Sequence, residues 1–305
     1  MRRFVLTRIV QSVVTLLVLS LMVFLLARAT GDPLSLVLPL GATQEDYENA
    51  RHYLGLDLPL SVQYVKFIAN AVRGDFGISL RVRRPVVDLL WERFPNSLAL
   101  AAVSMALSLA LAFPLGVLAA VHRDRALDRA AKIVATLGQA LPTFWLGIVL
   151  IEVVAGRLQW LPAGGTGDLS HYVMPAFTLA WFVLAGIMRL LRSSLLEVLD
   201  SDFVRTARAK GVPEAGVVWR HALRNALIPV VTFAGVYFAI LVTTAIVVET
   251  VFAWPGMGRL AYEAITARDF PVIQAVVLVT ALVVVVANFT VDLLYVYLDP
   301  RIRYG

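Results

Sequence analysis

Six apolar runs without a charged residue lie along the chain, at residues 9–27, 98–121, 133–151, 172–188, 226–248 and 272–291. A helix needs roughly 20 apolar residues to cross the ~30 Å of hydrocarbon in a bilayer. The pattern therefore predicts an all-α, polytopic membrane protein with about six transmembrane helices. Pro114, Pro142, Pro175 and Pro229 fall inside or at the edges of these runs. Neighbouring helices can satisfy the backbone groups that these prolines free, so we expect bends and not breaks.

The first run has a second interpretation. A basic start at Arg2 and Arg3, an apolar stretch and the closing Ala27-Arg28-Ala29 are also typical of a cleaved signal peptide. The apolar stretch is longer than the usual 7 to 15 residues of such a peptide. We therefore expect an uncleaved first transmembrane helix.

The distribution of positive charge predicts the orientation in the membrane. With a cytoplasmic N-terminus, the inside segments hold sixteen Lys and Arg residues and the two short outside loops hold three. The long first outside segment carries eight more, but long translocated segments largely escape the positive-inside rule. We expect both termini in the cytoplasm. The net charge of +6 then reflects topology and contact with membrane lipid, and no nucleic-acid partner is expected.

The same pattern divides the chain into four parts. Residues 1–28 form the N-terminal tail and first span, and residues 29–93 form a small extracytoplasmic cap with short amphipathic stretches such as Ser61–Val72. Residues 94–298 hold the remaining five spans and a cytoplasmic loop at 195–226, and residues 299–305 form a cytoplasmic tail.

Composition and motifs argue against an enzyme. The chain is 59% hydrophobic and only 16% charged, and it has no cysteine, whereas soluble domains carry about a quarter charged residues. A phosphate-binding loop needs Gly-Lys followed by Ser or Thr, and none of the three lysines follows a glycine. The four histidines are scattered, without metal-ligand spacing. We expect no catalytic residue, metal site or cofactor in this chain, and any ATP hydrolysis must occur on another chain.

Acidic residues in membrane spans are costly and therefore mark candidate transport paths. Glu152, Glu249 and Asp292 are the acids nearest the apolar runs. Each lies at a predicted span end, where a side chain can reach the interface or cap a helix. An ion-coupled secondary transporter usually places such a carboxylate in mid-span, so this pattern weakens that alternative.

The loop between the fourth and fifth predicted spans, Leu190–Pro229, is too long for a simple connection. Asp202 can cap a short helix that ends near Lys210, and Gly211 supplies a left-handed stop. Pro213 and Glu214 then supply the start of a second short helix on the cytoplasmic face. This helix–turn–helix is either an amphipathic segment held by anionic lipid or a docking site for a cytosolic partner.

This loop resembles a known signature. Arg205-Thr206-Ala207-Arg208-Ala209-Lys210-Gly211, followed by residues 220–229 (RHALRNALIP), is similar to the EAA motif of permeases in the dipeptide, oligopeptide and nickel branch of ABC importers. The general motif has Glu where Arg205 stands, and the departure matches the peptide branch. The resemblance implies that this loop is the coupling helix that sits in a cleft of the ATPase. It assigns ATPase coupling to nine residues: Arg205, Thr206, Ala207, Arg208, Ala209, Lys210, Gly211, Val212 and Pro213.

The resemblance extends along nearly the whole chain. It includes Thr30-Gly31-Asp32-Pro33, then RGDFGISL at 73–80, LPTFWLGI at 141–148, and the stretch from Val247 to Leu278 that contains FAWPGMG. It implies a pore-forming permease that imports di- or oligopeptides or a related small solute across a bacterial or archaeal cytoplasmic membrane. The implied partners are a sister permease, two cytosolic ABC ATPases carrying ATP and Mg²⁺, and an extracytoplasmic solute-binding protein. A secondary transporter and a structural scaffold of a membrane complex remain the alternatives.

Overall fold

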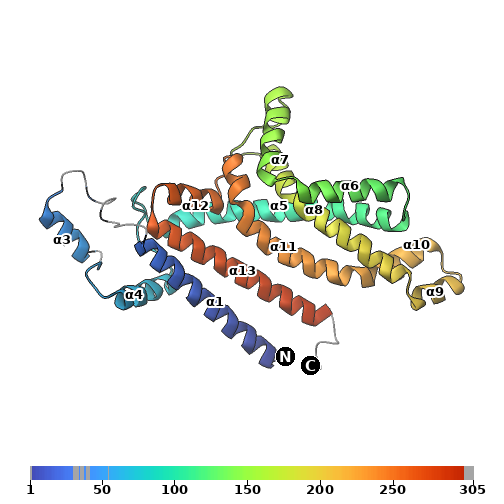
Figure 1. Ribbon diagram of the computed structural model, residues 1–305, viewed down its shortest axis with the longest axis horizontal. Helices are drawn as coiled ribbons and strands as arrows, with labels where there is room; N and C mark the ends of the chain where they lie inside the picture. The colour runs from blue at the N-terminus through green and yellow to red at the C-terminus, as the bar shows by residue number, and fades with distance from the viewer. Residues whose placement is uncertain (1, 30–33, 35–37, 39–41, 54, 299–305) are drawn as a thin grey trace. The chain divides into compact units, whose positions relative to one another are not determined.

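The computed structural model describes residues 2–29, 34, 38, 42–53 and 55–298 (Figure 1). These residues are almost entirely helical, and the β feature among them is an isolated bridge between Ile78 and Pro85. The helices are α1 (Arg2–Ala29), α3 (Gln44–Tyr53), α4 (Leu60–Val72), α5 (Val86–Val121), α6 (Ala126–Ala140), α7 (Thr143–Leu150), η1 (Ile151–Arg157), α8 (Ser170–Leu199), α9 (Asp202–Ala209), α10 (Glu214–Gly216), η2 (Val217–Ala222), α11 (Leu223–Val251), α12 (Met257–Thr266) and α13 (Phe270–Leu298). The all-α prediction is confirmed.

Five helices are long and apolar enough to cross a membrane, by length and composition alone. They are Val5–Ala29, Val86–Val121, Ser170–Leu199, Glu214–Val251 and Phe270–Leu293. The bent pair α6 and α7–η1 makes up to six if it forms one span. Each of the five contains one of the predicted apolar runs and extends beyond it, because polar residues at the ends continue the same helices.

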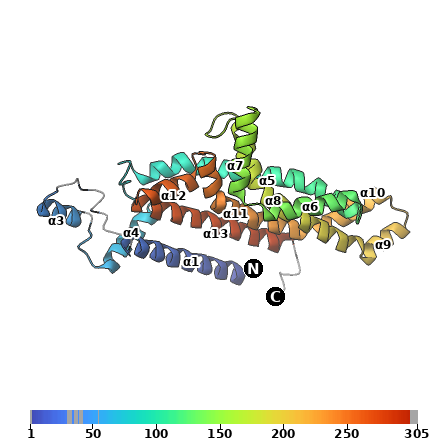
Figure 2. The same cartoon turned by 45° about the horizontal axis from the view of Figure 1, so that its top comes forward.

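The third predicted span differs from the prediction. α6 ends at Ala140, and the helix that starts at Thr143 is bent from it by 102° (Figures 1 and 2). Leu141 before the proline is extended, with φ −79° and ψ 124°, as the clash between a proline ring and the preceding residue favours. The expected bend at Pro142 is therefore a break. Pro114, Pro175 and Pro229 lie within the continuous helices α5, α8 and α11, as predicted.

The chain divides into two compact units: residues Met1–Ser97 with Pro255–Val285, and Leu98–Trp254 with Val286–Gly305. In the first, one hydrophobic cluster joins Val86, Leu89 and Leu90 of α5 to α12 and the start of α13. The buried Asp269 accepts hydrogen bonds from the Ser79 hydroxyl (2.5 Å) and the Leu80 backbone N–H (3.1 Å). Two segments that resemble the permease family, 190 residues apart at Ser79 and Asp269, thus meet at this carboxylate.

The cap prediction falls partly on residues that the structure describes. α3 and α4 lie within residues 29–93, and Tyr64 of α4 shares a 2.8 Å hydrogen bond with Ser20 of α1. Thr30-Gly31-Asp32-Pro33 and the tail 299–305 lie outside the described residues. The predicted division at residues 28, 93 and 298 stays a prediction.

In the second unit, α8 packs against both α6 and α11. Small residues allow the close approach, as is common between membrane helices. A Cβ added at Gly138 of α6 would lie 2.4 Å from the Cβ of Ala185 in α8, and one at Gly186 would lie 3.1 Å from the Phe233 ring of α11. Most of the large buried core of this unit therefore surrounds α8.

Gly138→Ala is expected to lower the free energy of unfolding by about 1–3 kcal/mol, because the added methyl group must push α6 away from α8. Thermal unfolding of the purified permease measures this loss. Gly156→Ala in η1 is the matched control, since its Cβ would make only ordinary contacts, the nearest at 3.6 Å. Equal unfolding temperatures for the two variants would contradict the close packing of α6 on α8.

The three acids near the apolar runs have different surroundings. Glu152 lies in η1 with its side chain 62% exposed and pairs with Arg157 at 3.2 Å, as a residue at the interface would. Asp292 lies within α13 and is partly buried. Glu249 is completely buried in the structure, so of the two predicted roles at a span end, reaching the interface or capping a helix, the first does not hold for its side chain. In the turn after α11, the backbone N–H of Trp254 donates to the backbone carbonyl of Glu249 (2.7 Å), and Trp254 is itself buried.

Candidate functional site: the segment between α8 and α11

The candidate site begins where α8 ends at Leu199 and runs through α9, a tight turn, α10 and η2 into α11. Ser201, not Asp202, occupies the N-cap position of α9, and Asp202 is its first residue. The predicted start at Pro213 and Glu214 is confirmed. The second helix is not short, however, because the helical path from Glu214 continues to Val251. The backbone at Val217 and Ala222 stays in the right-handed helical region, so nothing interrupts it.

Gly211 forms the turn after α9. Its φ of +77° lies in the left-handed region that favours glycine. The Gly211 N–H donates to the Arg208 carbonyl (2.9 Å), and the Val212 N–H donates to the Ala207 carbonyl (3.2 Å). These two bonds are the Schellman arrangement that ends many helices. The predicted glycine stop is therefore confirmed in its conformation and in its hydrogen bonds.

An ion pair closes the turn from the side. The Arg208 guanidinium donates to both carboxylate oxygens of Glu214, at 2.6 Å from Nη2 and 3.1 Å from Nε. The hydrogen bond to Glu214 raises the pKa of Arg208 above its ordinary value. Both side chains are substantially exposed, so the pair contributes at most about 1 kcal/mol to stability. Its bidentate geometry holds the end of α9 against the start of α10.

The segment has a buried side and an exposed side. Val204 of α9 and Val217 of η2 are fully buried in the core of the second unit, where Ala207 and Val212 pack beside them. Seven of the nine predicted residues are exposed: Arg205, Thr206, Arg208, Ala209, Lys210, Gly211 and Pro213. The structure thus brings the predicted residues together on one turn, with Ala207 and Val212 serving as anchors.

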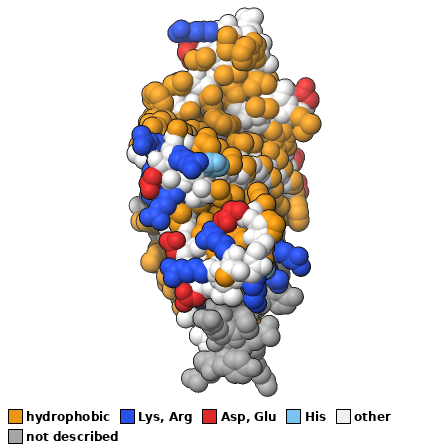
Figure 3. All heavy atoms as spheres, turned by 90° about the vertical axis from the view of Figure 1, so that its right-hand side faces the viewer, with side chains coloured by type: hydrophobic (Ala, Val, Ile, Leu, Met, Phe, Trp, Pro, Cys, Tyr) orange, Lys and Arg blue, Asp and Glu red, His pale blue; other side chains and the backbone are white. Residues whose placement is uncertain are grey.

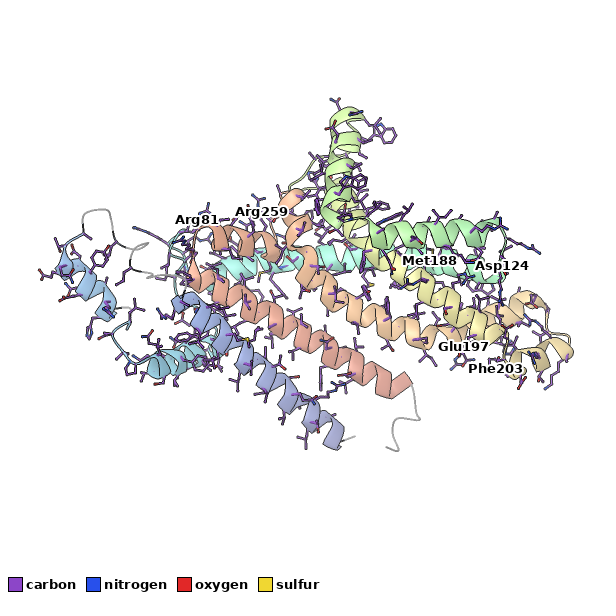
Figure 4. The ribbon with its side chains drawn as sticks, in the orientation of Figure 1. Arg81, Asp124, Met188, Glu197, Phe203 and Arg259 are labelled. Atoms are coloured by element: carbon purple, nitrogen blue, oxygen red, sulfur yellow. The ribbon has the colours of Figure 1, made fainter. Side chains whose placement is uncertain are left out.

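Two aromatic residues on this segment were not among the predicted site residues. Phe203 is 47% exposed on α9 and Trp219 is 57% exposed on η2. Figure 4 shows Phe203 on α9 near the end of α8 that carries Glu197. Exposed aromatic residues among charged neighbours are typical of protein–protein interfaces. The sequence did contain a signal for both. Phe203 and Trp219 each stand next to a charged residue, Asp202 and Arg220, and each lies on a different side of its helix from the buried Val204 or Val217.

The connection between α5 and α6 lies near the end of α8. Arg123 pairs with Asp200 at 3.8 Å, directly before α9. Asp128 in the first turn of α6 is fully buried and accepts from Arg192 of α8 at 2.5 and 2.8 Å, while the Lys132 ammonium lies 2.9 Å away. In Figure 3, basic and acidic side chains gather on the face where α9, α10 and this connection lie in Figure 1. Sequence reasoning did not identify this cluster.

Comparison with known proteins identifies the class. Residues 112–304 match the family described as the binding-protein-dependent transport system inner membrane component, and residues 1–101 match the N-terminal part of such membrane components. The chain therefore belongs to this family, whose members are the membrane permease subunits of ABC importers and not enzymes. It is a multi-pass inner-membrane protein of the bacterial type, and the family membership gives no support to a secondary transporter.

Individual relatives within this family can also be compared with the chain. The chain is 43% identical over 305 residues, all of both chains, to the glutathione transport system permease protein GsiC of Escherichia coli K12. The same identity and coverage hold for GsiC of Shigella dysenteriae. Among solved structures, an inward-facing MetNI methionine ABC transporter is similar, with a TM-score of 0.57, 20% identity, and coverage of 69% of this chain and 96% of that chain. At that identity the likeness concerns the fold.

Proposed function

We propose that the exposed side of residues 202–222 binds a cytosolic ATPase and transmits its movement to the membrane helices. The observation that carries this proposal is the Gly211 turn, which is held by two backbone hydrogen bonds and the Arg208–Glu214 pair. Val204 and Val217 anchor its underside in the core that surrounds α8. A force on the exposed side therefore acts on α8 and α11 and not on a loose loop.

The assembly that fits this proposal contains this chain, a sister permease, two ATPases that carry ATP and Mg²⁺, and an extracytoplasmic solute-binding protein. Binding and hydrolysis of ATP close and reopen the ATPase pair. The turn around Gly211 passes this movement to the two permeases, between which the solute crosses inward. The cap at residues 29–93 lies on the outer face and meets the binding protein.

A peptide is the solute class that the relatives favour. Proteins 43% identical over their full length are glutathione permeases, and glutathione is a small peptide with two free carboxylates. The resemblance of the 205–211 segment to the peptide branch agrees with this choice. Dipeptides, short oligopeptides and glutathione are accordingly the first solutes to test.

Co-purification tests the assembly. The permease expressed with its neighbouring transport genes is expected to retain ATPase subunits, and hydrolysis in lipid is expected to rise when loaded binding protein is added. A permease that transports without any ATPase would refute the proposal. Crosslinks from the binding protein only to loops other than residues 29–93 would refute the role of the cap.

The proposed orientation places both termini and residue 210 in the cytoplasm. Because the chain has no cysteine, Lys210→Cys introduces a single thiol on the exposed turn. A membrane-impermeant maleimide is expected to label it only after the cells are opened. Asp168→Cys is the control, because this exposed residue lies in the loop before α8 that is predicted to face outside; it should label in intact cells. Labelling of position 210 in intact cells would reverse the orientation.

A further inference from the structure

A pocket of about 510 Å³ lies between α6 and α8 in the second unit. Its floor includes the buried Ala135 and Met188, and Figure 4 shows Met188 on α8 beside α6. Its polar wall consists of Lys132, Thr136, Gln139, Arg189 and Arg192. The volume falls within the range of about 300–1,000 Å³ that is usual for small-molecule sites.

The wall carries more positive charge than its neighbours neutralise. Asp128, behind the pocket, accepts hydrogen bonds from Arg192 and pairs with Lys132. Arg189 is exposed, and its Nη1 donates to the amide oxygen of Gln139 at 2.9 Å. Within the described part of the chain, no acidic side chain forms an ion pair with Arg189. The Arg189 guanidinium is therefore bound by the neutral amide of Gln139, and no carboxylate of the described residues neutralises its charge.

The exposed residues of α6 form two separate stripes. Leu127, Ile133 and Leu137 are exposed apolar residues on one side. Lys132, Thr136 and Gln139 recur at spacings of four and three and form a separate polar stripe along the pocket. Hydrocarbon favours the first stripe and penalises the second. The polar stripe beside the pocket therefore suits water or another polar surface, while the apolar stripe suits lipid or a neighbouring apolar helix.

We propose that this pocket binds an oxyanion group, a carboxylate or a phosphate, with Arg189 and Gln139 as its polar contacts. Two sources offer this chemistry: the carboxylate of the solute that crosses inward, and the headgroup of an anionic lipid. The separation of the two stripes on α6 favours the solute. The site then deepens the proposed function, on which its transport role rests, by adding a contact for acidic solutes on the inward path.

Thiol chemistry at Thr136 tests the site without any measurement of transport. In the complete complex with its ATPases, Thr136→Cys supplies the only thiol of this chain. Its rates of modification by a negatively charged sulfonatoethyl methanethiosulfonate and a positively charged trimethylammonioethyl analogue are compared. We expect the anionic reagent to be favoured, and Arg189→Gln to lower the ratio of the two rates by about three- to tenfold, from the loss of one nearby charge. Arg189→Lys should largely keep the ratio, and Leu137→Cys on the apolar stripe should react slowly with both reagents.

Protection experiments distinguish the two sources. Slower modification by the anionic reagent when S-methylglutathione is added in phosphatidylcholine bilayers assigns the solute carboxylate. S-methylglutathione keeps both carboxylates of glutathione but has no free thiol to consume the methanethiosulfonate reagent. Slower modification only when phosphatidylglycerol is included assigns the lipid headgroup. A rate ratio that Arg189→Gln leaves unchanged, or no modification at position 136, overturns the oxyanion site. ATPase content and stimulated hydrolysis of the same samples report separately on the proposed coupling, so the two failures can be told apart.

Discussion

Gly211→Val is expected to reduce solute uptake by about tenfold or more while insertion of the permease stays near normal. A left-handed conformation costs an ordinary residue roughly 1–2 kcal/mol, and a β-branched residue fares worse. Apart from Gly211 itself and its two chain neighbours, no atom of the described residues lies within 4 Å of the position that a Cβ would occupy, so the cost comes from the backbone at φ +77°. The turn is then expected to open and to misplace α9 relative to α11. Uptake and hydrolysis stimulated by loaded binding protein, measured on the complex in lipid, give the size of the loss.

Two further variants make this test specific. Gly165→Val places the same strain in open space at φ +81°, in the loop before α8, and should leave coupling nearly unchanged. Gly211→Asn should keep much of the activity, because asparagine tolerates the left-handed conformation better than other residues with a side chain. Wild-type uptake and stimulation in Gly211→Val would show that residues 202–222 form only an interfacial segment.

The sequence predicted this turn because its signals are local. A glycine after a short amphipathic stretch and a Pro-Glu pair two residues later are enough to place the stop and the next start. The length of the second helix was mispredicted, although a signal was available. Between Gly216 and Pro229 there is no glycine or proline to end a helix, and the structure shows an uninterrupted path from Glu214 to Val251.

The break at Pro142 shows where local signals fail. Four prolines lie in or beside apolar runs, and their sequence surroundings do not separate the one that ends a helix from the three that do not. The difference comes from packing. Gly138 brings α6 close to Ala185 of α8, while Gly147 of α7 packs beneath Phe252 after α11. The two halves of the predicted span thus pack against different parts of the chain. Hydrophobic periodicity along one segment cannot reveal those packing partners.

The buried position of Asp128 was equally beyond local reasoning. Its partner Arg192 is 64 residues away, and the sequence placed both in cytoplasmic segments where charged residues are ordinary. Only the packing of α6 on α8 makes Asp128 a fully buried carboxylate. The same packing creates the pocket in which Arg189 and Gln139 meet. Non-local contacts of this kind decide which charges are structural and which face a ligand.

Asp128→Ala is expected to lower the free energy of unfolding of the permease by about 3–5 kcal/mol, because removing one partner of a buried ion pair leaves the other without compensation. Arg192 is only 20% exposed and Asp128 is fully buried. The Asp124 N–H also loses its acceptor, the Asp128 carboxylate at 2.9 Å. Asp124→Asn is the matched control: that side chain is 76% exposed, and asparagine tolerates the left-handed φ of +63° at this position, so stability should change by no more than about 0.5 kcal/mol.

Exchanging the two charged residues distinguishes the effect of the ion pair on stability from the effect of side-chain size. The double variant Asp128→Arg with Arg192→Asp should recover part of the stability that each single change loses, since the opposite charges still meet between α6 and α8. Thermal unfolding in the same detergent is compared for Asp128→Ala, the Asp124 control, the two single exchanges and the double variant. If Asp128→Ala unfolds at the temperature of Asp124→Asn, the pair does not hold the start of α6 to α8. Recovery in the double variant, together with recovered uptake, would show that this link also keeps the end of α8 in the position from which α9 presents the Gly211 turn.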